Sequence, residues 1–327
     1  MKKIVSISII MLSLVITSCN NYLDINQDPN SPSGTDVTSS MLMPAAEMNL
    51  ASSYGDFLRI TGGYFSEQYA QDFGTSNYLD YSQFQMSATR SSTNYTQMST
   101  HVMNSLNSIR SKSVAGNDWG SYLAATTLRA FTYQSLVDCY GEIPYTEALD
   151  VNNTSPKYDE GQTIYNGILG ELNDALSKAT PSETVCTNFL FPSASADSWI
   201  KFAKALKLKI LTRESGVKDV SSSIDSLIEE NDFPTSDVAW SGCWSNASGS
   251  MSPFYAEEFS STWGNTQINV VANLSVINTM LQKDEGGNVT YKDPRLAAWI
   301  SPNTSGNYTG GVSGTDFSTS STYKAPY

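Results

Sequence analysis

Aromatic side chains gather in two stretches of the chain that lack helical spacing. Residues 71–94 mix tyrosine and phenylalanine with Ser, Thr, Asn and Gln, and residues 233–264 hold half of the six tryptophans among Gly, Ser and Pro. Rings without a helical period are not placed by amphipathic packing, and recognition residues concentrate on loops. The rings that we expect to form a ligand-binding site are Tyr78, Tyr81, Trp240, Trp244 and Trp263.

This composition suits a sugar ligand but does not identify the ligand, because aromatic platforms accept rings of different types. A sugar ring presents flat apolar C–H faces and a rim of hydroxyl groups, so its binder needs exposed aromatic platforms beside Asn, Gln, Asp or Arg side chains. Both aromatic stretches contain such polar neighbours. The alternative for each ring is that it fixes its loop onto the protein body, because tryptophan is largely buried even outside regular structure. The sequence leaves that choice open.

Residues suited to catalysis or metal binding are few. The only histidine is His101 and no G-x-S-x-G motif occurs, so a histidine-rich metal site is excluded and a serine-type triad would rest on His101 alone. A glycosidase needs two positioned carboxylates. Glu257 and Glu258 are adjacent, but adjacency along the chain does not place them in one cleft, and surface charge is the ordinary explanation. We expect a binding protein with no catalytic residues and no metal ion or other cofactor.

The charge balance of the chain is acidic. The 327 residues include 19 Lys and Arg against 32 Asp and Glu, which gives a net charge of −13 at pH 7. Such a surface repels phosphate backbones, and this excludes nucleic acid as a partner. With 40% hydrophobic and 16% charged residues, the composition is that of a globular protein with a large core.

A long apolar helix is expected at the centre of the fold. Residues 119–140 follow Asp118, a suitable N-cap, and carry apolar side chains on both helix faces. Neighbouring elements must therefore cover this helix nearly all round. Gly141 suits a left-handed conformation after the helix, and Pro144 blocks its continuation.

Further helical patterns flank this segment and indicate an all-α fold. The first, over residues 41–69, is expected to bend or split at Gly62-Gly63. The other patterns cover residues 95–109, 164–179, 197–213, 224–228 and 270–281. Lysines accompany the apolar stripe of residues 197–213, and we interpret them as a solvated face rather than a patch for an anionic ligand.

The N-terminal residues have the pattern of a bacterial lipoprotein leader. Two lysines precede an apolar run that is too short to span a bilayer, and small residues stand directly before Cys19, as in a lipobox. We expect residues 1–18 to be a signal peptide, Cys19 to be acylated and residues 19–40 to form a polar tether. An ordinary signal peptide is the alternative. The residue after the cysteine is Asn20 rather than an aspartate. In bacterial lipoproteins an aspartate at that position favours retention at the inner membrane, so the resemblance implies export to the outer membrane.

Three cysteines remain beyond Cys19. Cys139 lies in the last turn of the central helix, where we expect a buried thiol that behaves as a small hydrophobe. Cys186 and Cys243 are a possible disulfide pair, and the sequence does not decide whether they are bonded.

Several motifs follow Cys19 in order and extend to about residue 300. They are NNYLDINQDPN at 20–30, YGEIPYTEAL at 140–149, SPKYDEGQTIYNGIL at 155–169, DSWIKFAKALKLKILTR at 197–213 and DPRLAAW at 293–299. Together they resemble the SusD-like (SusD/RagB) family of outer-membrane nutrient-binding lipoproteins. The resemblance covers nearly the whole mature chain, which makes it more specific than any single motif.

The resemblance implies tetratricopeptide-like helix pairs with long aromatic-rich loops. The helical domain would cover residues 41–300, and a Ser/Gly/Thr-rich end would cover residues 301–327, with the chain ending earlier than its relatives. The implied role is that of a non-catalytic, lipid-anchored protein on the cell exterior. It would capture oligosaccharides and deliver them to a SusC-like TonB-dependent transporter of the outer membrane. A peptide-binding member of the family and a secreted glycoside hydrolase are the alternative functions.

Overall fold

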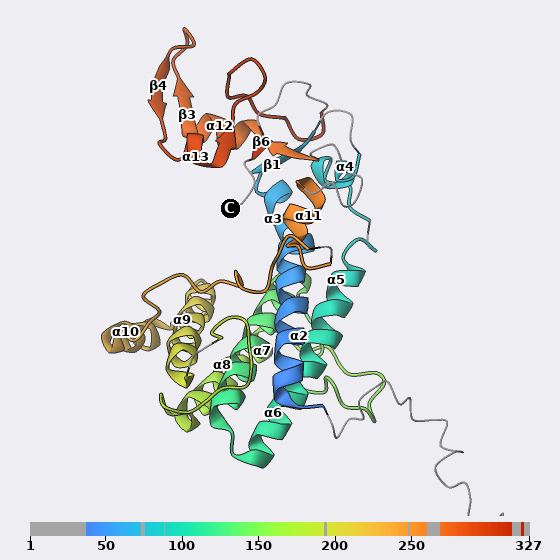
Figure 1. Cartoon of the computed structure of the whole chain (residues 1–327), viewed down its shortest axis with the longest axis vertical. Helices are drawn as coiled ribbons and strands as arrows, with labels where there is room; N and C mark the ends of the chain where they lie inside the picture. Colours follow the sequence, from blue (N-terminus) through green and yellow to red (C-terminus); the bar gives the residue numbers. More distant parts are fainter. Residues whose placement is uncertain are drawn as a thin grey trace, which may run out of the picture.

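Helices form most of the molecule, and short strands lie at one end of it (Figure 1). The computed structural model describes residues 37–72, 76–87, 89–192, 195–247, 249–259, 269–315 and 322–323. Within these ranges no helix combines the length and the hydropathy needed to cross a membrane. The predicted all-α fold class is confirmed.

The central helix α7 (Trp119–Tyr140) forms where the sequence predicts it. Asp118 caps its start, because the carboxylate Oδ1 accepts a hydrogen bond from the backbone N–H of Ser121 at 3.0 Å. Side chains on all faces of α7 are buried. Gly141 follows the helix with a φ of 76°, a conformation that glycine adopts without steric cost.

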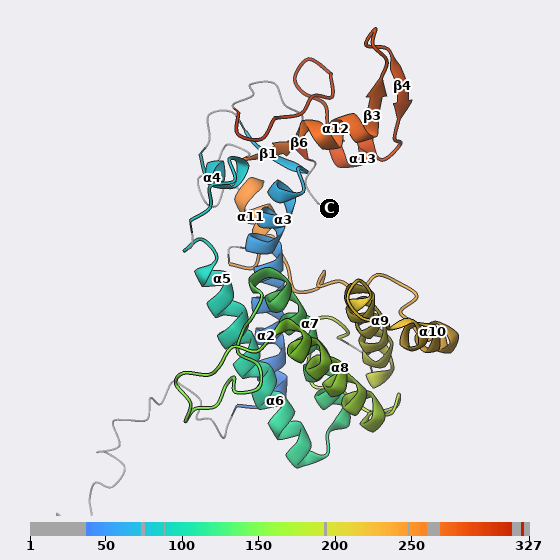
Figure 2. The same cartoon turned by 180° about the vertical axis from the view of Figure 1, so that it is seen from behind.

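Successive helices pack side by side around α7. The helices with the most extensive contacts to it are α6 (Met103–Gly116), α8 (Gly161–Lys178) and α9 (Ala196–Glu214). α10 (Ser221–Glu230) packs against α9 on the outside (Figures 1 and 2). Their apolar faces meet in one core around the fully buried Trp199. This arrangement is the stacked helix-pair architecture that the sequence predicts.

The first helix contains a π-helical turn. α2 (Ser39–Ser53) continues through the turn η1 (Tyr54–Leu58) into α3 (Arg59–Phe65). The predicted break at Gly62-Gly63 is wrong, because both glycines lie inside α3. The glycine at position 63 allows close packing instead, since a Cβ there would lie 2.2 Å from the Tyr69 ring.

Antiparallel strands cover the end of the molecule beyond α3. The sheet runs in the order β1 (Tyr69–Gln71), β2 (Val270–Ala272), β6 (Thr322–Tyr323) and β5 (Ile300–Ser301). A separate hairpin of β3 (Leu281–Lys283) and β4 (Val289–Lys292) projects from this end in both views (Figures 1 and 2).

The predicted helix over residues 270–281 is therefore wrong in its first part. Val270 and Val271 are β-branched and pair with β1, with Ala70 opposite Val271. Helix α12 (Leu274–Met280) begins only after Asn273, whose side chain caps it.

Short helical segments complete the structure. They are α4 (Leu79–Ser82), α5 (Ser92–Thr96), the π-helical η2 (Gln97–Val102), α11 (Pro253–Glu258) and α13 (Leu296–Trp299). α5, η2 and α6 follow one another without a break, so the helix predicted from residue 95 begins three residues earlier.

The cysteines differ in part from expectation. Cys139 is exposed, so the prediction of a buried thiol is wrong; it lies in the last turn of α7 on a side that, with the neighbouring Asp138, is open to solvent. Cys186 and Cys243 are both free thiols. Burial raises the pKa of the Cys186 thiol to about 11, which disfavours the reactive thiolate.

Candidate ligand-binding cavity

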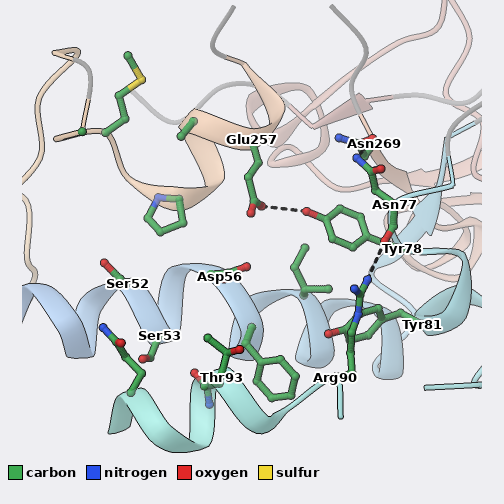
Figure 3. Close-up of a pocket in the computed structure, with 18 residues that line it drawn as sticks. Ser52, Ser53, Asp56, Asn77, Tyr78, Tyr81, Arg90, Thr93, Glu257 and Asn269 are labelled. Atoms are coloured by element: carbon green, nitrogen blue, oxygen red, sulfur yellow. Dashed lines mark hydrogen bonds between the residues drawn. The ribbon is translucent and has the colours of Figure 1, made fainter. Parts of the chain in front are cut away.

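A cavity of about 930 Å³ lies where the long first helix meets α5 and α11 (Figure 3). Its walls come from segments far apart in the sequence: residues 52–60, 77–97 and 249–257, with Asn269 before β2. Serine, threonine, asparagine and glutamine side chains in these walls offer both hydrogen-bond donors and acceptors. Such a lining suits a ligand rich in hydroxyl groups.

The π-helical turn η1 shapes one wall of the cavity. A π-helical turn widens the helix locally and occurs frequently at functional sites. Asp56 and Phe57 of this turn line the cavity, and the Gly55 carbonyl accepts a hydrogen bond from Arg59 Nε at 2.7 Å. Gly55 also lets α11 come close, because a Cβ there would lie 3.1 Å from Pro253 Cδ.

Glu257 connects α11 to two other segments. Its Oε2 accepts hydrogen bonds from Arg59 Nη2 at 2.8 Å and from the Tyr78 hydroxyl at 2.9 Å. Figure 3 shows the bond from Tyr78. Burial raises the pKa of Glu257 and the charge of Asp56 raises it further, while Arg59 acts in the opposite direction. Burial and the Glu257 charge also raise the pKa of Tyr78, so this hydroxyl remains a hydrogen-bond donor at neutral pH. The Tyr78 ring is thereby held in the cavity wall.

Glu258 has a separate, structural role. It is 5% exposed, and its Oε2 accepts hydrogen bonds from the backbone N–H groups of Asn269 at 2.7 Å and Val270 at 3.1 Å. These bonds join α11 to the start of β2. Of the adjacent pair Glu257 and Glu258, only Glu257 lines the cavity in the described structure.

The segment before α4 forms the far wall. Asn77 Nδ2 donates to Asn269 Oδ1 at 2.9 Å, and Arg90 Nη2 donates to the Asn77 carbonyl oxygen at 2.8 Å. Arg90 also pairs with Asp80 at 3.2 Å. In the described ranges of the chain, no three His, Cys, Asp or Glu side chains come together in a metal-binding cluster.

The five aromatic residues predicted to bind a ligand differ in burial and in whether they line the cavity. Tyr78 lines the cavity and is half-buried. Tyr81 also lines it but is only 3% exposed, so it supports the wall rather than offering a stacking face. Trp240 and Trp244 are half-buried and lie outside the cavity lining, as far as the described residues define it. Trp263 lies outside the described residues.

The family of the chain follows from a comparison of its sequence with known families. Residues 29–326 match the SusD-like family that is described as "Starch-binding associating with outer membrane". The chain belongs to the SusD-like family. The resemblance drawn from the motifs is thereby confirmed. A comparison of this SusD-like sequence with curated proteins finds no match.

Solved structures of SusD homologues share the fold. A homologue from Bacteroides fragilis has a TM-score of 0.62 and 18% identity, with 84% of this chain and 58% of the other covered. One from Bacteroides uniformis has a TM-score of 0.61 and 17% identity, with coverages of 86% and 60%. A protein named as chitin-binding has a TM-score of 0.65 and 16% identity, with coverages of 88% and 64%. The SusD-like chain thus spans about three-fifths of the length of these relatives.

Trp240 fastens its loop to the helical body of this SusD-like fold. Its ring packs against the main core and meets Phe131 edge-on, with 6.3 Å between the ring centroids. The indole also lies close enough to the buried Glu47 carboxylate to oppose the rise that burial causes in the pKa of Glu47. Trp240 therefore fits the structural alternative that the sequence left open.

Replacing Trp240 with alanine should lower the free energy of unfolding by about 2 kcal/mol, less than for a fully buried tryptophan. We expect the affinity for a bound ligand to stay unchanged, because the ring lies outside the cavity lining. Thermal unfolding and titration calorimetry measure the two quantities. A loss of affinity with an unchanged melting temperature would show instead that Trp240 belongs to the ligand-binding surface.

The sequence does not indicate a role at the cavity for Asp56, which lines it, or for Arg59, which is bonded to the cavity residue Glu257. Both lie in a stretch with helical periodicity, where charged residues are ordinarily assigned to the solvent-facing side. The π-helical turn that presents Asp56 contains Gly55, but a single glycine within a helical pattern does not indicate a π-helical turn. The pairing of Arg59 with Glu257 joins residues 198 positions apart, which no local pattern reveals.

Proposed function

We propose that this SusD-like protein is a lipid-anchored glycan-binding protein of the outer membrane, exposed at the cell exterior. It captures oligosaccharides in the cavity beside Tyr78 and delivers them to a SusC-like TonB-dependent transporter without cleaving them. The observation that carries the proposal is the cavity of about 930 Å³, with polar walls and a fixed tyrosine ring, in a SusD-like fold. The family description and the chitin-binding name of one structural relative support glycans as the ligand class.

The lining matches the surface chemistry of a sugar. The hydroxyls of Ser52 and Thr93 and the amide of Gln97 can each donate to or accept from sugar hydroxyls. The Tyr78 ring adds an apolar surface for the C–H face of one sugar unit, and such a stacking contact contributes about 0.5–1.5 kcal/mol beyond the area that it buries. Because most of these groups lie on helices, the site is preorganised.

The environment of Glu257 favours binding over catalysis. A glycosidase needs a carboxylic acid that donates a proton to the leaving oxygen and a second carboxylate opposite it. Asp56 and Glu257 do line one cavity. However, Oε2 of Glu257 is held by hydrogen bonds from both Arg59 and Tyr78, which oppose the rise that burial causes in its pKa and fix the carboxylate in the cavity wall.

Incubation of the purified protein with soluble oligosaccharides tests the absence of turnover. We expect the oligosaccharides to be bound and recovered at their original length after prolonged incubation, as measured by product chromatography. The matched variant is Glu257→Gln, which keeps the shape of the side chain. Hydrolysis by the parent protein that disappears in this variant would overturn the non-catalytic assignment.

Membrane attachment is expected to depend on Cys19. The protein expressed in a bacterium with a lipoprotein pathway should yield an N-terminal peptide that begins at an acylated Cys19, detected by mass spectrometry. Cys19→Ser should move the protein from the membrane fraction to the soluble fraction. An unmodified Cys19, or a mature N-terminus elsewhere, would remove the lipid anchor from the proposal.

A further inference from the structure

Two phenylalanine rings lie at the surface where α3 and α4 end. Phe65 is the last residue of α3 and is 48% exposed, and Phe84 follows α4 by two positions and is 56% exposed. Their ring centroids are 5.6 Å apart, and the ring planes are inclined by 32°. The two rings therefore form one apolar surface, the Phe65–Phe84 platform. Neither ring lines the cavity in the described structure.

The backbone at position 84 has a conformation that suits glycine or asparagine. Phe84 has a φ of 55°, in the left-handed region. Its N–H donates to the Tyr81 carbonyl oxygen at 3.1 Å, and the N–H of Gln85 donates to the Asp80 carbonyl oxygen at 2.7 Å. This pair of bonds closes a helix end around a left-handed residue, where a Cβ atom costs free energy.

Other helix ends of the chain follow the usual preference. Asn117 after α6 and Asn231 after α10 hold φ values of 53° and 47°. Burial of a large ring could offset the cost of a phenylalanine at such a position, but the Phe84 ring is more than half exposed. Strained residues of this kind cluster at binding sites. Phe84 is therefore explained neither by its backbone nor by the core, and this indicates a ring that contacts a ligand.

The surroundings of the platform suit a glycan better than a protein partner. Gln83 and Gln85 flank Phe84 and Ser66 follows Phe65, and all three are exposed. A stable protein interface covers about 800 Å² of each partner, far more than two half-exposed rings among polar residues provide. A sugar needs only one ring for its C–H face and polar groups beside it for its hydroxyls.

The platform lies within reach of a glycan held in the cavity. Tyr81 lines the cavity and precedes Phe84 by three positions, so their Cα atoms are at most about 11 Å apart. Tyr64, the neighbour of Phe65 on α3, packs against the cavity residues Tyr78 and Tyr81, with centroids 5.9 and 6.0 Å away. The same pair of helices thus carries the cavity wall and the platform.

We infer that the Phe65–Phe84 platform is a second contact site for glycans, which stacks on sugar units that extend beyond the cavity. The platform makes the protein selective for chains longer than the cavity holds. This inference rests on the proposed function and adds the length of the glycan to its specificity. Phe84 is the specificity-determining residue.

Titration calorimetry with short and long members of two glycan series tests the inference. The probes are maltotriose and maltoheptaose, after the starch-binding description of the family, and chitotriose and chitohexaose, after the chitin-binding relative. Phe84→Asn should weaken binding of the longer oligomer by several-fold to about tenfold and that of the trisaccharide by less than about twofold. Its melting temperature should stay the same or rise, because asparagine suits the left-handed backbone.

Two further variants separate the loss of this ring from general effects. Tyr158→Asn removes a ring that is 65% exposed on another loop, and it should keep the full preference for the longer oligomer. Phe84→Tyr keeps a ring at the platform and should keep that preference as well. Unchanged binding of both oligomers by Phe84→Asn, or an equal loss for both, would overturn the inference. A lower melting temperature of Phe84→Asn would also contradict it, because the ring would then be a structural anchor.

The parent protein distinguishes this inference from the proposed function. Equal affinity of the parent for the short and the long oligomers contradicts the platform and leaves glycan binding in the cavity intact. Absence of binding to all four oligomers and to every other glycan in a panel contradicts both.

Discussion

Replacing Arg129 with alanine is expected to lower the free energy of unfolding by about 3 kcal/mol. Arg129 lies in the middle of α7 and is 7% exposed, and its guanidinium contacts the Glu171 carboxylate on α8. It also lies over the rings of Tyr133 and Tyr145, at 4.7 and 5.3 Å from their centroids. Removing one partner of a buried ion pair costs about 3–5 kcal/mol, because the other charge remains buried.

The expected loss is at the lower end of that range because Glu171 keeps other partners. The Tyr145 hydroxyl donates to Glu171 at 2.7 Å, and Arg110 lies 3.5 Å from it. Thermal and urea unfolding, analysed for a cooperative transition, measure the change.

A matched control is Lys201→Ala, which removes a half-exposed pair with Asp197 one helix turn away. Surface pairs of this kind contribute little, so no measurable change is expected. If Arg129→Ala is as stable as the parent protein, the α7–α8 interface does not depend on this ion pair.

The helical body of the fold could be predicted from local sequence patterns. The Asp118 cap, the apolar positions of α7 and the Gly141 exit are each determined by residues within a few positions of one another. The same holds for α8, whose apolar stripe is buried as its spacing predicts. Such local information suffices because a helix satisfies its own backbone hydrogen bonds.

The strands at the other end of the molecule could not be predicted in this way. Val270 and Val271 form β2 because they pair with β1, about 200 positions earlier in the chain. A short apolar run of this length fits a strand or a helix equally well when its partner is unknown. The error in the 270–281 prediction therefore comes from a long-range contact.

The candidate site was predicted only in part for the same reason. Tyr78 and Tyr81 have the same residue type and lie three positions apart, yet Tyr78 is half-buried at the cavity and Tyr81 is enclosed. Their difference depends on how α4 packs against α3, which composition does not encode. Composition indicated a loop that lines the candidate cavity, but not which of its rings is accessible there.

Placing a tryptophan at position 93 is expected to block ligand binding. Thr93 is an exposed residue of α5 whose side chain points into the cavity (Figure 3). Thr93→Trp would fill part of the cavity with an indole ring at little cost to stability, because the position is exposed to solvent. Oligosaccharide affinity should fall by more than about tenfold, since the ligand would have to displace the ring.

Thr96→Trp provides the matched control. Thr96 lies on the same helix, is also exposed and is not part of the described cavity lining. The substitution is chemically identical, so any general effect of an added indole on solubility or helix stability appears in both variants. The melting temperatures of the two variants should agree.

The most direct test of the account is a calorimetric comparison of the parent protein, Thr93→Trp and Thr96→Trp. The ligand is the oligosaccharide that the parent binds most tightly in a glycan panel. The account predicts that the parent and Thr96→Trp bind it with equal affinity and that Thr93→Trp binds it more weakly by a factor of more than about ten. Equal affinity of all three proteins, or the absence of any glycan ligand for the parent, would contradict the assignment of this cavity as the glycan-binding site.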